Sequence, residues 1–403
     1  MRADIPICVV TSHGRQVLTA RPGERVLDVL TRYQVPWSGV SIYAVPRSGG
    51  PARLSACLDK QPGELDDIAE LQIFLNRNVN PFLFSLDAAL TQESADPAPV
   101  TEYVYQHLDG SASVAESYLR KLSSAECKEI VVERVADCIR AAVPTGSTLV
   151  VGVSGGGDSN ALLYALSHLA GHSITVDPVI LKGIPDWDQG VPRAEAICAS
   201  YGLPLTVLEE DDVAELLAIP PGSTPLIERF ERAFPGDDFE FLGTLLIRLA
   251  LARRAREVGT PFICTGLNLE DVVCEGLFRF SSGMQPAPVP VRAIGDVSLI
   301  LPLWRCPKRI LDGCFPAYSL QNYQARYPCF SLGRNLYYSV VYAMQSQFPG
   351  FVEQLAAGIA ELAQAHPVSY TYDSQLGFHI ERQIPFPLRR AFERMLGRSG
   401  AVG

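Results

Sequence analysis

The stretch that decides the fold is residues 149–159, which read Leu-Val-Val-Gly-Val-Ser-Gly-Gly-Gly-Asp-Ser. Its first half has the pattern of an apolar strand, its second half is rich in glycine, and residues 160–169 continue as a good helix. Three glycines let the backbone bend so that successive N–H groups face one anion, and the positive end of the following helix points to the same place. The sequence therefore predicts a phosphate-binding loop between a strand and a helix.

Strand and helix patterns alternate after this loop. Such alternation is typical of an α/β fold with a parallel sheet. Strands are expected at residues 148–153, 175–181, 205–208 and 261–265, and helices are expected from Ser159, from Arg193 and over 239–258.

The glycine loop differs from two commoner phosphate motifs. No Lys-Ser/Thr pair follows the glycines, as a Walker loop requires, and the Gly-x-Gly-x-x-Gly spacing of dinucleotide folds is absent. The six residues 154–159 instead resemble the Ser-Gly-Gly-x-Asp-Ser signature of the PP-loop ATP pyrophosphatases, a family with HUP-like α/β domains similar to adenine nucleotide alpha hydrolases. In that family ATP is cleaved to AMP and pyrophosphate while a substrate is adenylated. The alternative is a glycine turn that only lets the helix pack.

The resemblance implies that the chain uses ATP and Mg²⁺ as cofactors. Asp158 would help to place the magnesium ion, and both Asp158 and Ser159 are candidate catalytic residues. The ATP-binding residues implied in the loop are Ser154, Gly155, Gly156, Gly157, Asp158 and Ser159, of which the two serines would hold the departing pyrophosphate.

A second segment extends the resemblance. Residues 264–271 read Cys-Thr-Gly-Leu-Asn-Leu-Glu-Asp, where the tRNA-lysidine and tRNA 2-thiocytidine synthetases carry Gly-His-His-x-x-Asp between a strand and a helix. Thr265 and Gly266 match and are implied to bind ATP, and Asp271 matches and is implied to be catalytic. Leu267 and Asn268 stand where the histidines would be.

Acidic side chains gather at the start of the helix that follows. Glu270, Asp271 and Glu275 would fall on or near one face, which suits a metal or general-base cluster. The predicted metal ligands are Asp158, Glu270 and Asp271. The alternative is a first helical turn whose acidic residues are favoured by the helix dipole.

Two basic residues outside these motifs are further candidates. Arg248 lies in the helix before the second motif, where a guanidinium could neutralise the triphosphate in a catalytic role. A solvated helix face that also carries Arg253, Arg254 and Arg256 is the alternative. Lys182 follows the second strand, and ligands bind at the carboxyl ends of parallel strands, so Lys182 is a candidate for binding ATP.

The resemblance covers about residues 145–355. It includes Pro302-Leu303 followed by the basic run Lys308-Arg309, and a later Gly-Arg-Asn segment at residues 333–335. We therefore expect a PP-loop domain at residues 144–330 and a C-terminal helical region at 331–403.

The first 80 residues have a different pattern. Their expected order is β-β-α-β-β, with strands near residues 5–10, 15–19, 40–45 and 71–75 and a helix at 24–33. This order resembles the β-grasp domains of ubiquitin-like and sulfur-carrier proteins, and residues 1–80 are predicted to form such an α+β domain. Because the segment runs on into more protein at Asn78-Val79-Asn80-Pro81 instead of ending in an exposed Gly-Gly, docking of a protein partner is favoured over carrier chemistry, with dimerisation or shaping of a substrate channel as alternatives. A linker at 86–101 and a helical stretch at 115–142 are expected within residues 81–143.

Composition narrows the class of protein. The chain has 403 residues and a net charge of −10, which gives no overall attraction to nucleic acid. No apolar run approaches the length of a membrane span, and the N-terminus lacks the apolar core of a signal peptide, so a cytoplasmic protein is expected.

Ten cysteines occur without a Cys-x-x-Cys pair. Cys306, Cys314 and Cys329 are interpreted as core or incidental cysteines, with a cluster or sulfur carrier as the alternative.

Three functions remain open at this point. The first is modification of a tRNA base by thiolation or a lysidine-like reaction, with an unstacked base held near basic residues such as Arg389, Arg390 and Arg394. The second is formation of an amide or thioamide on a small molecule, which suits the acidic chain. The third is a nucleotide-binding regulator without turnover, which the missing histidines suggest.

Overall fold

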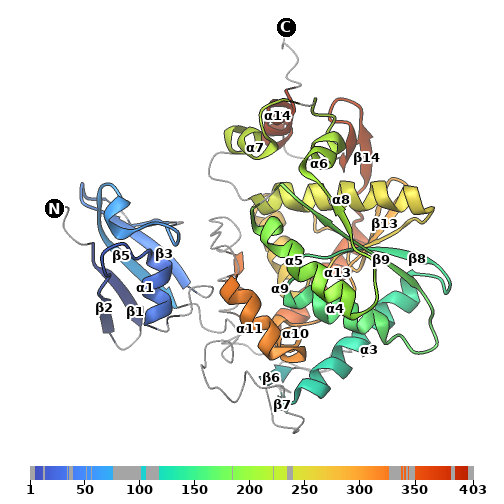
Figure 1. The fold of residues 1–403 in the computed structure, drawn as a ribbon, viewed down its shortest axis with the longest axis horizontal. Helices are drawn as coiled ribbons and strands as arrows, with labels where there is room; N and C mark the ends of the chain where they lie inside the picture. The colour runs from blue at the N-terminus through green and yellow to red at the C-terminus, as the bar shows by residue number, and fades with distance from the viewer. Residues whose placement is uncertain are drawn as a thin grey trace.

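The computed structural model describes most of the chain and contains two large sheets (Figure 1). Among the described residues, no helix combines the length and apolar character of a membrane span. The described residues are 5–11, 14–33, 35, 40–50, 52–55, 57–75, 101–105, 118–183, 185–220, 222–233, 239–325, 337–338, 340–341, 344, 350–382 and 386–397.

The central sheet has six strands in the order β10-β9-β8-β11-β13-β12. All neighbouring pairs are parallel except β12 with β13 at one edge, so the predicted α/β fold with a parallel sheet is confirmed. The strands are β8 (Thr148–Gly152), β9 (Thr175–Leu181), β10 (Thr206–Leu208), β11 (Phe262–Cys264), β12 (Val291–Ile294) and β13 (Val297–Ile300).

Both faces of this sheet are buried under helices, because successive residues of its strands point to opposite sides. Leu149 and Val151 pack into the core that is covered by α3 (Ser124–Ala142), α4 (Gly157–Ser167) and α5 (Pro185–Ser200). Val150 packs on the other side against α8 (Phe239–Val258). Figure 1 shows the sheet between these two helical layers.

The bounds of β9 and α8 coincide with the expectation, whereas the helix expected over residues 115–142 is wrong at its start. The structure has the strand β7 (Tyr118–Leu122), paired with β6 (Thr101–Tyr105), before α3. The reason is local: Ser123 caps α3 by accepting the N–H of Glu126, whose carboxylate accepts the N–H of Ser123 in return. A helix that starts with this cap cannot continue backwards through residue 123. The linker expected at 86–101 lies outside the described residues except for Thr101.

The N-terminal sheet has the order β2-β1-β5-β3-β4. The expected sequence β-β-α-β-β is present, with the short β4 added before the last strand. Val26, Val29 and Leu30 of the helix are buried against this sheet. The elements are β1 (Ile7–Thr11), β2 (Gly14–Leu18), α1 (Val26–Arg32), β3 (Val40–Pro46), β4 (Arg53–Leu54), the 3₁₀ turn η2 (Pro62–Glu64) and β5 (Ile68–Leu75).

Smaller elements surround the central sheet. The expectation of a helical C-terminal region is wrong for residues 370–381, which form an antiparallel hairpin rich in the strand formers Tyr and Thr. The remaining elements are α6 (Glu210–Leu216), α7 (Leu226–Ala233), α9 (Leu269–Ser281), α10 (Lys308–Cys314), α11 (Pro316–Ala325), α13 (Phe351–Ala365), β14 (Tyr370–Asp373), β15 (Phe378–Glu381) and α14 (Phe386–Met395).

Two ion pairs are built into the packing around α9. Arg279 of α9 makes a bidentate contact with Glu381 of the C-terminal hairpin, at 2.6 and 2.7 Å. Arg292 of β12 holds Glu275 of α9 at 3.0 and 2.5 Å. Both arginine side chains are only 6% exposed, so each guanidinium depends on its carboxylate for its charge partner. Glu275 is thereby a structural residue and not part of an acidic cluster open to a ligand.

Candidate functional site

The glycine loop lies where the sequence predicts it, between the carboxyl end of β8 and the start of α4. Gly156 is the N-cap of α4, and the first helical bond runs from the N–H of Asn160 to the carbonyl of Gly156. The N–H groups of residues 157–159 therefore have no acceptor within the helix. They form an anion-binding end of the kind that holds phosphates in other proteins.

The loop is closed by contacts within itself and with α5. The hydroxyl of Ser159 accepts the N–H of Ser154 at 3.0 Å, and the two serine hydroxyls also lie 3.0 Å apart. Gly155 has φ +71°, and a Cβ added to it would lie 2.5 Å from the carbonyl oxygen of Gly190. Glycine is therefore required at 155 for two reasons, its backbone conformation and the close approach of α5.

Asp158 is the centre of a polar cluster. Its Oδ1 lies 2.8 Å from Nζ of Lys308, and its Oδ2 accepts a hydrogen bond from the side-chain amide of Asn268 at 3.1 Å. Lys308 also pairs with the fully buried Asp312 at 2.7 Å. The loop, the start of α9 and the start of α10 thus meet at one carboxylate.

Asn268 stands where the related synthetases carry a histidine, and it has a defined role. It is the N-cap of α9: its side-chain oxygen accepts the N–H of Asp271, and the Asp271 carboxylate accepts the N–H of Asn268. Its amide nitrogen is left to donate to Asp158. From the sequence, this position is interpreted only as a missing histidine of the motif. An Asn before an apolar helix, with Asp three residues later, is nevertheless a helix-capping signal.

Burial changes the acid–base behaviour of the next two residues. It raises the pKa of Asp271 to about 6, while a hydrogen bond from the hydroxyl of Tyr338 and the nearby Asp158 charge act in opposite directions. Burial raises the pKa of Glu270 to about 8, and its Oε2 accepts the backbone N–H of Lys308 at 2.9 Å. Asp271 is therefore the carboxyl group of this pair that faces the loop residue Asp158, and Glu270 fixes the start of α10.

Two of the three predicted metal ligands, Asp158 and Asp271, lie near each other, and the third, Glu270, does not join them. Within the described part of the chain, no three His, Cys, Asp or Glu side chains come together as a metal site, and Glu270 is buried against α10. Asp158 and Asp271 lie close enough for their charges to interact. Mg²⁺ in nucleotide sites commonly takes one or two carboxylates and completes its shell with phosphate and water, so this pair fits the ion.

The helix α11 forms a wall of the loop that sequence reasoning missed. The hydroxyl of Tyr318 donates to the carbonyl of Gly155 at 2.5 Å. The hydroxyl of Ser319 is buried, has no partner among the described residues, and lies 2.8 Å from where a Cβ of Gly157 would be. An unsatisfied buried hydroxyl costs free energy, and an anion in the loop is a suitable acceptor for it.

Thr265 and Gly266 follow directly after β11, the strand beside β8. The Thr265 hydroxyl is buried and has no hydrogen-bond partner among the described residues. A Cβ on Gly266 would meet Leu162 and Leu303 only at 3.9 Å, so packing alone does not require glycine there.

Among the described contacts, none joins the side chain of Lys182 or of Arg248 to residues 154–159. Lys182 lies at the carboxyl end of β9 and pairs with Glu209 at 2.8 Å. The guanidinium of Arg248 donates to the carbonyl of His379 at 2.8 Å, on the side of the sheet covered by α8. A triphosphate-neutralising role for Arg248 therefore has no support from its position.

The other candidates are placed as follows. The nine described cysteines are buried and form no disulfides, and burial raises the pKa of Cys306 to about 12 and that of Cys314 above its usual range. Cys329 lies outside the described residues. Arg389 pairs with Asp373 at 2.5 Å and with Glu393 at 3.2 Å, so its charge is engaged within the C-terminal region.

Comparison with known proteins agrees with this geometry. No protein-family model matches the chain. The chain is 26% identical over 236 residues to a tRNA-cytidine(32) 2-sulfurtransferase of Nitrosospira multiformis, which covers 56% of this chain and 73% of that protein.

A solved structure shares the fold of the central region. The U34-tRNA thiolase NcsA from Methanococcus maripaludis, solved with its [4Fe-4S] cluster, superposes with a TM-score of 0.51 at 16% identity, over 61% of this chain and 82% of that one. An NH₃-dependent NAD synthetase from Campylobacter jejuni aligns over 61% of this chain and 95% of its own, at 14% identity and a TM-score of 0.33. The glycine loop, the parallel sheet that carries it and the similarity to the sulfurtransferase support a relationship of this chain to the PP-loop ATP pyrophosphatases.

Proposed function

We propose that this chain is an ATP-dependent enzyme that adenylates a carbonyl oxygen of a tRNA base, releases pyrophosphate, and lets sulfur replace that oxygen. The observation that carries the proposal is the convergence on Asp158 of the phosphate loop, Lys308 and the Asn268–Asp271 cap. A phosphate anion at the end of α4 would lie beside a cation and a pair of carboxylates, which is what transfer at a nucleotide phosphate needs.

The loop acts on the pyrophosphate part of ATP. The N–H groups of residues 157–159 and the hydroxyls of Ser154 and Ser159 would donate to its oxygens, and Ser319 would add a donor from α11. Lys308 would supply a positive charge that balances the negative charge on the leaving group. Asp158 and Asp271 would hold Mg²⁺, whose contribution when bound is to neutralise phosphate charge.

The reaction balances in two steps. The carbonyl oxygen of the base attacks the α-phosphorus of ATP, forming an O–P bond, and the bond to the β-phosphate oxygen breaks to release pyrophosphate. Hydrosulfide delivered by a donor then adds to the activated carbon, the C–O bond breaks to release AMP with its electron pair, and loss of the S–H proton leaves the C=S bond. Adenylation is needed because a carbonyl oxygen is a poor leaving group until it carries phosphate.

Thiolation of tRNA is supported by the sulfurtransferase relative and by the fold shared with the U34-tRNA thiolase. The sulfur source is proposed to be a separate donor, because the described cysteines are buried, and those with shifted pKa values are shifted upward by burial, which disfavours the thiolate that sulfur transfer requires. A lysidine-like reaction with a nitrogen nucleophile is an outcome that the test below distinguishes.

The N-terminal residues are proposed to form a β-grasp domain that docks a protein partner. The sheet order β2-β1-β5-β3-β4 with α1 against it supports this. Boundaries near residues 80, 143 and 330 and a cytoplasmic location are part of the same proposal.

The deciding experiment separates AMP from ADP after incubation of the purified chain with ATP, Mg²⁺ and bulk tRNA or a metabolite extract. Asp158→Ala should lose AMP formation by at least about a hundredfold, as removal of a key electrostatic group does in other enzymes. Asp137→Ala, on the exposed face of α3, is the matched control and should keep full activity.

The products identify the substrate. AMP formed only with tRNA, together with a sulfur-for-oxygen mass change in one digested nucleoside, supports thiolation. AMP formed only with the metabolite extract would favour a small-molecule amide- or thioamide-forming enzyme, which the net charge of −10 also suits. No AMP with either additive would leave nucleotide binding without turnover as the function.

A further inference from the structure

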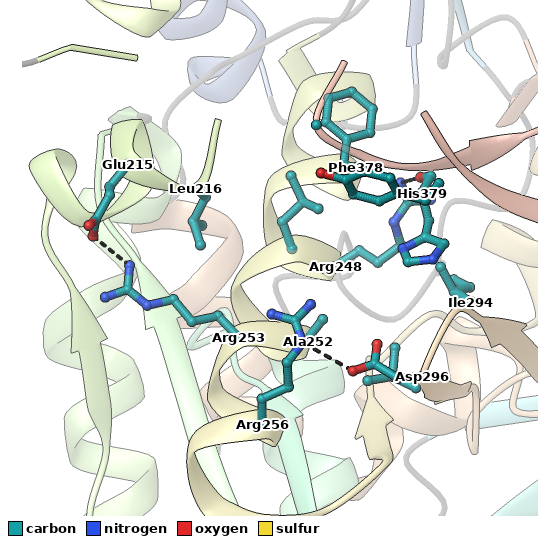
Figure 2. Close-up of a pocket in the computed structure, with 14 residues that line it drawn as sticks. Glu215, Leu216, Arg248, Ala252, Arg253, Arg256, Ile294, Asp296, Phe378 and His379 are labelled. Atoms are coloured by element: carbon teal, nitrogen blue, oxygen red, sulfur yellow. Dashed lines mark hydrogen bonds and ion pairs between the residues drawn. The ribbon is translucent and has the colours of Figure 1, made fainter. Parts of the chain in front are cut away.

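A pocket of about 380 Å³ lies away from the glycine loop, between α8, the β12–β13 turn and the C-terminal hairpin (Figure 2). Its charged lining includes Arg248, Arg253 and Arg256 from α8, with Glu215 and Asp296 opposite. Its volume is within the roughly 300–1,000 Å³ of pockets that bind small ligands.

The pocket and the glycine loop lie at opposite ends of the strands of the central sheet. The loop follows the carboxyl end of β8, whereas the pocket is lined by Asp296 and Val297 at the start of β13. β13 runs parallel to β11, and β11 runs parallel to β8. The two sites are therefore separated by the length of the strands, and a ligand in this pocket would not contact the loop.

The positive charge of Arg248 is the least compensated in the pocket. Its one hydrogen bond within the described structure goes to the carbonyl of His379, and no ion pair joins it to a described carboxylate. The nearby Glu381 is already held by Arg279 through two bonds. Burial lowers the pKa of Arg248, yet a guanidinium stays protonated in proteins, so its charge remains.

The other two arginines have partners that a ligand could replace. Arg253 pairs with Glu215 and Arg256 with Asp296, as Figure 2 shows. Both carboxylates are more than half exposed, at 70% and 57%, and ion pairs so open to water contribute little free energy. An anion placed beside Arg248 would therefore find two further cations within the same pocket.

One side of the pocket is aromatic. Tyr372 is 61% exposed, and its ring meets that of His379 edge to face at 5.5 Å. The His379 ring is fixed against Gly295, where an added Cβ would lie only 2.4 Å from it. An exposed tyrosine beside arginines offers a planar surface next to an anion-binding group, and nucleic-acid bases stack on such surfaces.

We propose that this pocket binds a nucleoside monophosphate, either free or as one unit of an RNA strand, with the phosphate beside Arg248 and the base against Tyr372. The phosphate supplies the negative charge that Arg248 lacks, and the base covers the exposed ring. This site is independent of the adenylation chemistry proposed above.

The test is isothermal titration calorimetry of the full chain with uridine monophosphate and with inorganic phosphate. Arg248→Gln should weaken binding of both by about tenfold or more, the value of a charge-assisted hydrogen bond. Tyr372→Ala should weaken binding of the nucleotide but not of phosphate. Arg254→Gln is the matched control on α8, because Arg254 pairs with Asp177 and does not line the pocket.

The outcomes separate this site from the loop. Asp158→Ala should leave uridine monophosphate binding unchanged, so failure of the adenylation proposal does not affect this one. Tighter binding of a short single-stranded oligouridylate, equally sensitive to Arg248→Gln and Tyr372→Ala, would assign the pocket to an RNA strand; tighter binding of the free nucleotide would assign it to a metabolite.

The proposal is overturned by three results: no binding of the nucleotide at millimolar concentration, an equal loss in Arg254→Gln, or loss of binding in Asp158→Ala. Because Tyr372 is exposed, Tyr372→Ala keeps the test valid if Arg248→Gln fails to fold.

Discussion

Nζ of Lys308 lies 2.8 Å from Oδ1 of Asp158, although 150 residues separate the two in sequence. The same ammonium group lies 2.7 Å from Oδ1 of Asp312, a side chain with no exposed surface. One cation therefore links the phosphate loop to α10 and compensates a buried carboxylate at the same time.

Replacement of Lys308 by Met keeps the length of the side chain and removes its charge. We expect the free energy of unfolding to fall by about 2–4 kcal/mol, because Asp312 then keeps its negative charge in the interior without this ion pair. Urea unfolding measures the change. Arg309→Met, one residue further along α10, is the control, and an equal loss in both variants would show that the Lys308 ion pairs do not contribute specifically.

A pair of glycine substitutions separates backbone strain from the packing of the loop. Gly155 and Gly171 have nearly the same positive φ, +71° and +70°, but only Gly155 has a neighbour where a Cβ would be, the carbonyl of Gly190 at 2.5 Å. Gly171→Ala should cost about 1 kcal/mol of unfolding free energy from conformation alone.

Gly155→Ala should cost about 1–3 kcal/mol more than Gly171→Ala, because either the loop or α5 must move. Thermal unfolding of the two variants measures the difference. Equal losses would mean that α5 yields without cost and that the close approach does not hold the loop.

Removal of the Ser319 hydroxyl should affect the bound state more than the free protein. In the described structure this hydroxyl is buried and has no hydrogen-bond partner. Ser319→Ala should therefore leave the melting temperature of the free chain unchanged or slightly raised, and should weaken ATP binding by about 1 kcal/mol.

Calorimetric titration with ATP and Mg²⁺ checks the second half of this expectation. Ser167→Ala serves as the control, since Ser167 caps the carbonyl of Tyr164 at the far end of α4. Unchanged ATP affinity in Ser319→Ala would remove α11 from the site.

Stability should depend on pH through Glu270. Burial raises the pKa of this carboxyl group from 4.5 to about 8, so the folded chain holds its proton more tightly than the unfolded chain. The resulting stability is fully present below the unfolded pKa and is lost as the pH rises through the folded pKa. We expect the free energy of unfolding to decline between about pH 4.5 and pH 8 for this reason.

Glu270→Gln removes this part of the decline, because the amide has no proton to lose. The variant should be more stable than the parent by roughly 4–5 kcal/mol at pH 8 and above, with a smaller difference near pH 5. Urea unfolding at a series of pH values provides the measurement, with the exposed Glu129→Gln as control. A difference that does not change with pH would show that Glu270 is already ionised in the folded chain.

The loop and its sheet could be predicted because their signals are local. Apolar runs such as residues 148–152 and 175–181 sit between glycine- or proline-containing turns, and the six loop residues are consecutive. The backbone conformation of Gly155 follows from residues next to it. Hydrophobic period and turn chemistry are sufficient for elements of this kind.

The rest of the site depends on contacts between distant segments. In the sequence, Lys308 is only part of a basic run that resembles the family. The residues around it do not predict its ion pair with Asp158. Ser319 and Tyr318 belong to a short helix whose weak pattern gives no sign that it packs on the loop. For Arg248 the sequence is misleading. Its position in α8 suggests that it neutralises the triphosphate of ATP, but its guanidinium donates to the carbonyl of His379, in a hairpin 131 residues away.

The bidentate contact of Arg279 with Glu381 bears on how much of the chain is needed to make a working domain. A fragment that stops near residue 330 would carry the complete glycine loop and all six strands of the central sheet, yet its Arg279 guanidinium would remain in the interior with its carboxylate missing. The C-terminal hairpin therefore supplies the charge partner of a buried arginine in α9, and a fragment made to carry the glycine loop should extend past residue 381 instead of stopping at the last strand of the central sheet.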